Sequence, residues 1–455
     1  NMRLVRDLCL LACLTTVTCD RVYVHPFNLF AFNKSTCEQL ESLAQEGKKT
    51  FVPVSIESQT PPAYEDDLKV KLEGPSLSGQ QSQELSVLER LVHTLLKRVY
   101  GKLQEVQQGQ NLLLSPTGLY SSLVSFYLGA SNQTAADVQT LMGFAPPSED
   151  DDCTTRVDGY KILSNLRMFE SLIKSKDEEL LFSKMLCLFS APGVPLSRLF
   201  VQDLLPSADA LYARAVDFTN PSEAAKQINT FMEAKSKAQS KHLLTDIDPS
   251  ANLLFALDIS MAANLKQASR LSEPQEFQVD SNTKIFVPML SVTGTFKYNT
   301  DASGTFSVVE IPISKTALLV LLHPINGSDL EHLESLSWLH QLSPREMKLT
   351  LPELRIESSY DLQEILADLG LPELLGKGAD LSKISDTNLT VGKVINRTFF
   401  KLMGDGTAQP EESAAQKEDL ALLELTLNKP FLFAIFEQKT RAMLLLGRVT
   451  NPLQG

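Results

Sequence analysis

The spacing of hydrophobic residues changes along this chain of 455 residues, and that change restricts the fold more than any other feature. Between residues 84 and 237, hydrophobic residues recur mostly every three or four positions, as they do on one face of a helix. From residue 252 onwards they form short apolar runs, which are typical of strands. Because helices and strands are grouped rather than alternating, the pattern predicts a mixed α+β body.

The expected elements follow from this spacing. A helix from Glu84 to Leu103 marks the start of the body, which is predicted to occupy residues 85–455. Ser115-Pro116 begins the second helix, to residue 128, because serine caps free N–H groups and proline fits the first helical position. The other expected helices are 133–142, 155–175, 222–237 and 360–369, and the expected strands are 183–190, 252–261, 284–297, 306–313, 317–323, 346–357, 391–402, 421–427, 431–436 and 442–449.

Residues 1–19 have the three-part layout of a secretory signal. Arg3 and Arg6 form a positive region, Leu8 to Val17 form an apolar run, and Cys19 stands at a cleavage site before Asp20. The apolar run is about half the ~20 residues of a membrane-spanning helix. Secretion is therefore predicted, with a short buried helix as the alternative.

The overall charge is acidic. Hydrophobic residues make up 43% and charged residues 21% of the chain, as in ordinary globular proteins. The net charge of −13 becomes −14 without residues 1–19, whose own charge is +1. This balance disfavours binding to nucleic acid or an anionic membrane and favours a soluble extracellular protein.

Three of the six cysteines lie within the signal, and three remain after its removal. Cys187 lies in an apolar run and is expected to be buried and unreactive. Cys37 and Cys153 lie in polar stretches and are predicted to form a disulfide. Closing this loop of 116 residues would constrain the unfolded chain by about 4–5 kcal/mol in the entropy model. The bond would also tether the N-terminal region to the body.

Five Asn-x-Ser/Thr sequences are candidate glycosylation sites in a secreted chain. They are Asn33, Asn132, Asn326, Asn388 and Asn396. Asn396 lies within an expected strand, so burial is its alternative. Asn33 lies just beyond the segment described next and could obstruct access to that segment.

The first residues after the signal form a distinctive segment. They are Asp20, Arg21, Val22, Tyr23, Val24, His25, Pro26 and Phe27, followed by Asn28, Leu29 and Phe30. The β-branched residues and the proline favour an extended backbone, the form in which a protease takes its substrate. Leu29-Phe30 places two large apolar side chains across one peptide bond, which suits an aspartic protease with apolar pockets.

The next region, residues 30–84, is predicted to be a tail and linker. Residues 48–83 are rich in Pro, Ser, Gln, Glu and Lys and lack periodicity, so at most short turns are expected there. On composition alone, a mobile terminus is the favoured reading of residues 20–36, and only the resemblance given below reverses it.

Motifs for catalysis or metal binding are missing from the sequence. The six histidines have no metal-ligand spacing, and no Gly-x-Ser-x-Gly nucleophile motif occurs. Gly370 to Gly378 has the wrong glycine spacing for a phosphate-binding loop. No catalytic residue, metal or cofactor is therefore predicted, although a scattered catalytic triad stays open.

Specific motifs then resemble one family. They are Asn428-Lys-Pro-Phe-Leu-Phe433, Leu446-Gly-Arg-Val449 with Asn451-Pro452, Asn111 to Ala130, Val287-Pro-Met289 with Gly294 to Phe296, and Ser359 to Leu362 with Gly378 to Ser382. In this order they are similar to segments of the serpins. The resemblance implies a serpin fold with three β-sheets, eight or nine helices, and an exposed reactive-centre loop near Met403 to Glu424.

Asp20 to Phe27 is similar to the angiotensin family of peptide hormones, with Val24 at a variable aliphatic position. The resemblance implies that renin cleaves Leu29-Phe30 and releases residues 20–29. Angiotensin-converting enzyme would then remove Asn28-Leu29. The remaining octapeptide would bind G-protein-coupled angiotensin receptors, mainly through Arg21, Tyr23, His25 and Phe27, and regulate blood pressure and salt and fluid balance as a vasoconstrictor. Asn28 departs from the histidine of many members.

The hinge of the reactive-centre loop distinguishes a precursor from a protease inhibitor. The resemblance implies that inhibitory serpins insert this loop as a new strand into the main sheet. Gly406 and Thr407 fit such a hinge, but Pro410 cannot donate a hydrogen bond, and Glu411 and Glu412 would bring charge into the sheet. A non-inhibitory serpin is predicted. Inhibition of a serine protease, or a serpin-type carrier, is the alternative.

Overall fold

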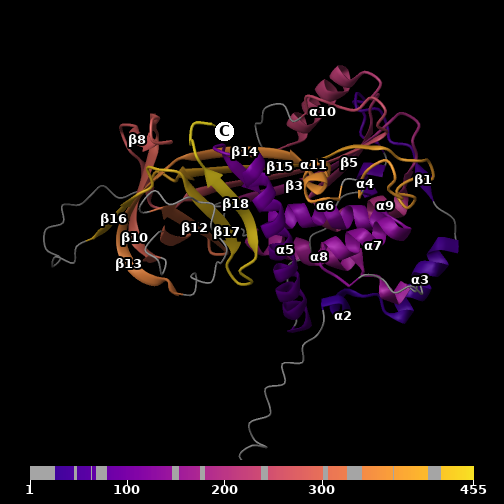
Figure 1. Cartoon of the computed structure of the whole chain (residues 1–455), viewed down its shortest axis with the longest axis horizontal. Helices are drawn as coiled ribbons and strands as arrows, with labels where there is room; N and C mark the ends of the chain where they lie inside the picture. The colour runs from indigo at the N-terminus through magenta and orange to yellow at the C-terminus, as the bar shows by residue number, and fades with distance from the viewer. Residues whose placement is uncertain are drawn as a thin grey trace, which may run out of the picture.

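A computed structural model of the protein describes residues 26–45, 49–62, 64–67, 79–145, 153–174, 180–236, 244–300, 306–324, 341–371, 374–407 and 422–454. Its fold is mixed α+β, as the sequence predicts. Most helices gather in one half of the molecule, and the larger sheet forms the other half (Figure 1). Within the described ranges, no helix combines the length and the apolar character needed to cross a membrane.

Ten α-helices are described within these ranges. They are α2 (Pro26–Phe30), α3 (Lys34–Gln45), α4 (Tyr64–Asp67), α5 (Gly79–Val106), α6 (Pro116–Gly129), α7 (Asn132–Leu141), α8 (Gly159–Ile173), α9 (Arg198–Asp203), α10 (Pro221–Lys235) and α11 (Leu362–Asp368). Ser115 caps α6 as predicted, because its Oγ accepts a hydrogen bond from the Gly118 N–H at 3.1 Å.

The strands form two large sheets and two small ones. The five-stranded sheet has the order β14 (Leu354–Asp361), β15 (Val391–Gly404), β6 (Leu253–Leu265), β3 (Leu180–Ser190) and β5 (Ala210–Ala215). The nine-stranded sheet has the order β16 (Leu423–Thr426), β13 (Ser343–Pro352), β10 (Met289–Thr300), β11 (Phe306–Pro312), β12 (Ala317–Pro324), β17 (Phe431–Glu437), β18 (Met443–Val449) and β2 (Leu112–Leu114), with β7 (Ala268–Arg270) beside β10. Two-stranded sheets join β8 (Gln275–Gln278) to β9 (Lys284–Val287), and β1 (Thr50–Phe51) to β4 (Leu196–Ser197).

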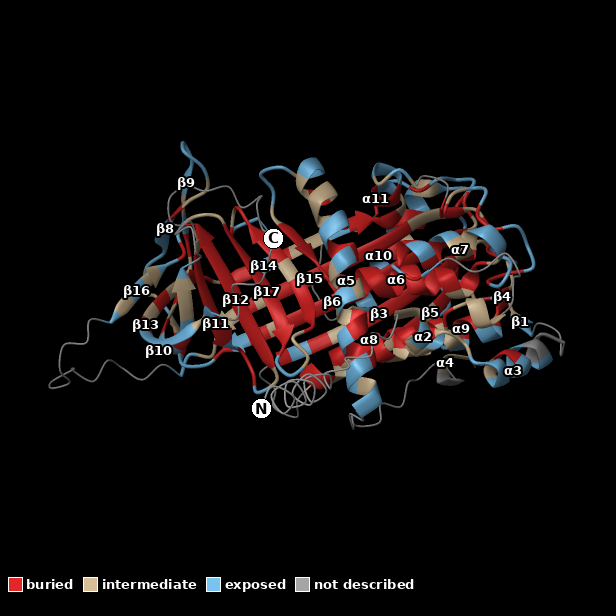
Figure 2. Ribbon diagram, turned by 60° about the horizontal axis from the view of Figure 1, so that its bottom comes forward, coloured by how far each residue is buried: buried red, intermediate tan, exposed pale blue. Residues whose placement is uncertain are grey.

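Helices cover both faces of the five-stranded sheet. On one face, Phe126 of α6 contacts Phe255 of β6, with ring centroids 5.2 Å apart. On the other face, Phe231 of α10 meets Phe189 of β3 at 6.0 Å. The centre of the molecule is consequently buried through both sheets and the helices between them (Figure 2).

Two expected strands are each divided by a proline. The run 346–357 becomes β13 and β14, which belong to different sheets, with the break after Pro352. The run 284–297 becomes β9 and β10, separated at Pro288. Proline lacks the N–H group that continues a ladder, so both breaks have a local cause.

Parts of the region predicted to be a linker are ordered and pack on the body, which corrects that prediction. Helix α5 begins at Gly79 rather than Glu84. Thr50 and Phe51 pair with β4, and Ser55 forms a bridge to Ala215 at the end of β5.

Aromatic and charged side chains hold residues 49–62 and 64–67 in place. The Phe51 and Tyr64 rings lie 4.6 Å apart, and the Tyr64 hydroxyl donates a hydrogen bond to the Ala213 carbonyl at 2.9 Å. Arg214 forms an ion pair with Glu65. These anchors are single residues at irregular intervals, so hydrophobic periodicity gives no sign of them.

Candidate functional site

The segment around Leu29-Phe30 is helical rather than extended, which corrects the expectation for these residues. Pro26 begins α2, where its missing N–H is not needed, and the helix ends at Phe30. The Ala31 N–H donates to the Phe27 carbonyl at 2.7 Å. Residues 20–25, including Asp20, Arg21, Val22, Tyr23, Val24 and His25, lie outside the described residues, as do Cys19 and the expected signal.

Phe30 is fully buried against the body. Its exposed fraction is 0%, and its ring lies 5.9 Å from the ring of Phe144 in an edge-to-face arrangement. Phe27 and Leu29 are half-buried and pack against the same core, whereas Asn28 is exposed. Burial of the Phe30 side chain alone stabilises this docking by roughly 1.5–3 kcal/mol.

The carbonyl groups of Leu29 and Phe30 also accept hydrogen bonds from the body. Lys161 Nζ, on α8, donates a hydrogen bond to the Leu29 carbonyl at 2.7 Å. The same ammonium group pairs with the carboxylate of Glu84 at 2.8 Å and lies 5.6 Å from the Phe30 ring centroid. The Asp158 N–H donates to the Phe30 carbonyl at 2.7 Å. In this conformation the peptide bond cannot be taken as an extended strand.

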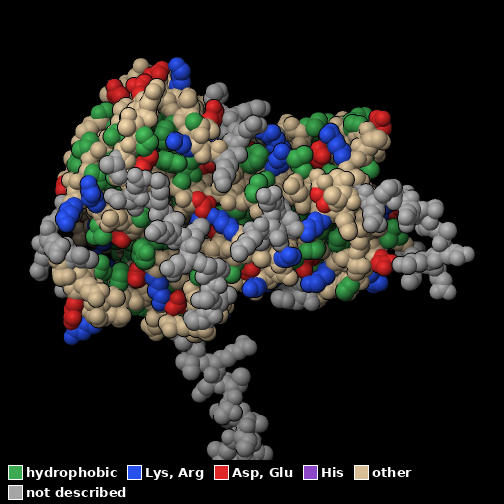
Figure 3. Space-filling view, turned by 180° about the vertical axis from the view of Figure 1, so that it is seen from behind, with side chains coloured by type: hydrophobic (Ala, Val, Ile, Leu, Met, Phe, Trp, Pro, Cys, Tyr) green, Lys and Arg blue, Asp and Glu red, His purple; other side chains and the backbone are tan. Residues whose placement is uncertain are grey.

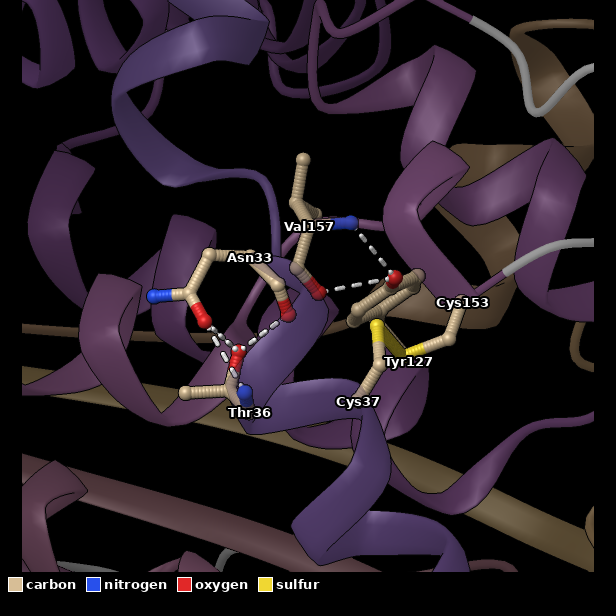
Figure 4. The surroundings of a disulfide bond; sticks show 6 residues. All are labelled: Asn33, Thr36, Cys37, Tyr127, Cys153 and Val157. Carbon is tan, nitrogen blue, oxygen red and sulfur yellow. Dashed lines mark hydrogen bonds between the residues drawn. A yellow bond between two sulfur atoms is a disulfide. The ribbon is translucent and has the colours of Figure 1, made fainter.

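The chain beyond Phe30 continues along residues 156–158. Ala31 forms an antiparallel bridge with Val157, and the Phe32 N–H donates to the Arg156 carbonyl at 3.1 Å. Val157 is itself fixed by the Tyr127 hydroxyl, which donates to its carbonyl at 2.9 Å and accepts from its N–H at 3.1 Å (Figure 4). Burial raises the pKa of Tyr127, so its hydroxyl keeps its proton.

A disulfide closes this region. Cys37 on α3 is bonded to Cys153, with 5.7 Å between the Cα atoms (Figure 4). Asn33 lies just before α3: its Oδ1 accepts from the Thr36 N–H at 2.9 Å, and its carbonyl accepts from the Thr36 hydroxyl at 2.8 Å. The predicted cysteine pair is thus formed, and it fastens the residues that follow α2. Cys187 is free and buried, and burial raises the pKa of its thiol.

The candidate glycosylation sites differ in how far their asparagines are exposed to solvent. Asn33, Asn132 and Asn388 are exposed. Asn396 is only 3% exposed and its Oδ1 accepts a hydrogen bond from Ser122 at 2.7 Å, so the folded chain cannot carry a glycan there and that prediction is wrong. Its strand position buries it within the five-stranded sheet. Asn326 lies outside the described residues.

The loop hinge is described only at its start. Gly406, with a φ of +70°, and Thr407 are exposed beyond the end of β15. Asp405 holds the turn, because its Oδ2 accepts from the Thr407 hydroxyl at 2.7 Å. Pro410, Glu411 and Glu412 lie outside the described residues, as do all of residues 408–421 of the expected loop. The two ends of that loop, Met403–Gly404 and Leu423–Glu424, belong to β15 and β16.

Lys161 and Glu84 are the residues of this site that sequence reasoning missed. Each is a single charged residue within the apolar periodicity of its helix, in α8 and α5 respectively. That pattern predicts a helical face but not a contact with the Leu29 carbonyl, 132 positions away. Among the described residues, no group of His, Cys, Asp and Glu is arranged to hold a metal ion.

Comparison with known proteins assigns the family. The family model described as "Serpin (serine protease inhibitor)" matches residues 92–452. Angiotensinogen of Homo sapiens is 38% identical over 98% of this chain and 97% of its own length. Angiotensinogen of Bos taurus is 39% identical over the same shares of the two chains. The chain is a serpin of the angiotensinogen family.

The fold of this serpin agrees with that assignment. A crystal structure of uncleaved ovalbumin matches it with a TM-score of 0.69 at 20% identity, covering 80% of this chain and all of that one. The serpin family match begins within α5, so α2 and α3 precede it in the sequence. The similarity to angiotensinogen, by contrast, covers nearly the whole chain.

Proposed function

We propose that this serpin is a secreted hormone precursor of the plasma. Renin cleaves Leu29-Phe30 and releases residues 20–29, and angiotensin-converting enzyme then removes Asn28-Leu29. The octapeptide 20–27 acts on G-protein-coupled angiotensin receptors as a vasoconstrictor that regulates blood pressure and salt and fluid balance. The similarity to angiotensinogen over 98% of the chain supports this role most directly.

The body controls access to the scissile bond. The Leu29 and Phe30 carbonyls are both hydrogen-bonded to α8 or its N-cap, and the Phe30 side chain is buried. A protease that binds its substrate as an extended strand therefore acts only after α2 has left the body. Release of α2 is a separate step that precedes cleavage, and any partner that lifts α2 accelerates the reaction.

The serpin body is neither an enzyme nor a protease inhibitor in this proposal. The hinge residues Pro410, Glu411 and Glu412 support this reading, because proline lacks an N–H for the ladder and buried carboxylates are unfavourable. A serine protease that cleaves the loop is expected to dissociate without forming a stable covalent complex. Such a complex on a denaturing gel would establish the inhibitory alternative.

The precursor role is tested by incubating the full-length protein with renin and weighing the fragments. A fragment of residues 20–29 is expected, with the body left intact. The matched control is Leu29→Lys, which places a charge beside the scissile bond while keeping the Leu29 backbone carbonyl that Lys161 binds. Loss of the fragment in this variant is expected. A wild-type N-terminus that stays uncut, or a cut elsewhere, would contradict the role.

A further inference from the structure

The junction between β15 and β6 is the place where an additional strand could enter the five-stranded sheet. These strands are paired in parallel from Val391 and Leu253 to Gly404 and Leu265. The neighbouring pairs, β14 with β15 and β6 with β3, are antiparallel. A strand that follows β15 through a loop runs opposite to it, and between β15 and β6 it would be antiparallel to both. This junction is called the seam below.

One buried ion pair crosses the seam. Arg397 of β15 and Asp258 of β6 are register partners, and Arg397 Nε lies 3.1 Å from Asp258 Oδ1. Their side chains are 0% and 2% exposed. A second carboxylate, that of Glu357 on β14, lies 3.2 Å from the same Nε. The guanidinium thus lies between carboxylates of both neighbouring strands.

Asp258 also accepts a hydrogen bond from the helix that covers this face of the sheet, α10. The hydroxyl of Ser236, the residue that ends α10, donates a hydrogen bond to Asp258 Oδ2 at 2.7 Å. Burial raises the pKa of Asp258, and Arg397 and Ser236 act against that rise. Within the described part of the chain, the guanidinium nitrogens of Arg397 make no hydrogen bond. The positive charge of Arg397 is therefore offset only by its electrostatic attraction to the carboxylates of Asp258 and Glu357.

We propose that Arg397 and Asp258 form an ionic lock that keeps the seam closed to any additional strand. Neighbouring strands lie about 4.8 Å apart, so an inserted strand would roughly double the separation of β15 and β6. The Arg397–Asp258 contact would then be lost, and two charges would stay buried without each other. An entering strand would have to supply a charge of each sign at this level to compensate.

The ionic lock is a property of the sheet that the proposed precursor function does not require. It is also separate from the hinge of the reactive-centre loop. Pro410, Glu411 and Glu412 hinder the chain's own loop, whereas the ionic lock acts on the sheet that would receive a strand. An external peptide has no hinge to refold, so its entry depends on the seam alone. This difference separates the two barriers experimentally.

The test uses the full-length protein and an acetylated peptide of alternating Thr and Val, 14 residues long to match β15. Native mass spectrometry measures the one-to-one adduct, and thermal unfolding measures its effect on stability. Wild type is expected to take up no peptide and to keep its Tm. The variant Asp258→Leu/Arg397→Leu removes both charges, and its peptide uptake is expected to be at least about a hundredfold greater, with a raised Tm.

Two further variants complete the design. Asp258→Asn/Arg397→Gln removes the same charges with little change in shape, and it gives the answer if the leucine variant does not fold. Lys297→Leu/Glu310→Leu removes a matched cross-strand pair, 2.8 Å apart between β10 and β11, and is expected to take up no peptide. Uptake by wild type equal to that of the seam variants, or no uptake by a folded seam variant, would overturn the ionic lock.

Discussion

Lys161 joins three parts of the molecule through one ammonium group. It binds the Leu29 carbonyl of α2, pairs with Glu84 of α5, and lies over the ring of Phe30. Its side chain is 34% exposed, so water weakens these interactions and the hydrogen bond to Leu29 contributes about 1 kcal/mol. Lys161 is therefore expected to slow the release of α2 rather than prevent it.

Replacing Lys161 by methionine tests this role. Lys161→Met removes the donor to Leu29 and keeps most of the side-chain volume, so cleavage by renin is expected to be about fivefold faster. Initial rates of release of residues 20–29 measure the effect. Lys102→Met, which removes an exposed pair with Glu105 on the same helix as Glu84, is the control and should leave the rate unchanged. Equal rates for Lys161→Met and wild type would remove Lys161 from the gating step.

Asp203 gives a pH-dependent prediction. Burial, and secondly the charge of Asp158, raise its pKa from 3.8 to about 6. The folded state then binds the Asp203 proton more tightly than the unfolded state, so this residue destabilises the fold increasingly between these two pKa values and fully above the higher one. Asp203→Asn is expected to stabilise the protein near neutral pH by up to about 3 kcal/mol and to have little effect below the unfolded-state pKa. Thermal unfolding at the two pH values measures this, and an equal effect at both would contradict it.

Individual elements were predictable where their signals are local. The cap at Ser115 and the proline after it define the start of α6, and the apolar run around Cys187 identifies β3. The break after Pro352 has a local signal, but periodicity does not predict that β13 and β14 join different sheets, because partners far along the chain decide it. The packing of residues 50–55 on the body was missed for the same reason, since β4 and β5 supply the partners of Thr50, Phe51 and Ser55.

The disulfide joins α3 to residues 153–155, and its removal is expected to change access to α2. The Cys37–Cys153 bond fastens the chain that follows α2, so its loss should free α2 more often. Cys37→Ser/Cys153→Ser is expected to be cleaved faster by renin and to be less stable, by up to about 4–5 kcal/mol in the entropy model. Cleavage rates and denaturant unfolding of the oxidised wild type and the variant measure both effects. Cleavage at the wild-type rate would show that the bond does not control access.

In the whole molecule, the candidate cleavage site and strand β16 lie far apart. Helix α2 lies beneath the helical half, whereas β16, which follows the loop, lies at the far end of the β-rich half (Figures 1 and 2). Basic and acidic side chains are interspersed over the face seen in Figure 3, without one large patch of a single sign.

The sequence predicts where the candidate site lies, but not its conformation. Leu29-Phe30 is recognisable as a pair of large apolar residues beside a hormone-like segment. Its helical form was not, because the Leu29 and Phe30 carbonyls are held by Lys161 and Asp158, far along the chain. Local β-propensity describes the free peptide, and docking on the body overrides it.

Cleavage kinetics show directly whether the body withholds the proposed scissile bond. Single-turnover cleavage by saturating renin is compared for the full-length protein and for a free peptide of residues 20–33. The same cut at Leu29-Phe30 is expected in both, at a rate about tenfold or more slower in the protein, because α2 must first be released. Equal rates, or a different cut in the protein, would contradict it.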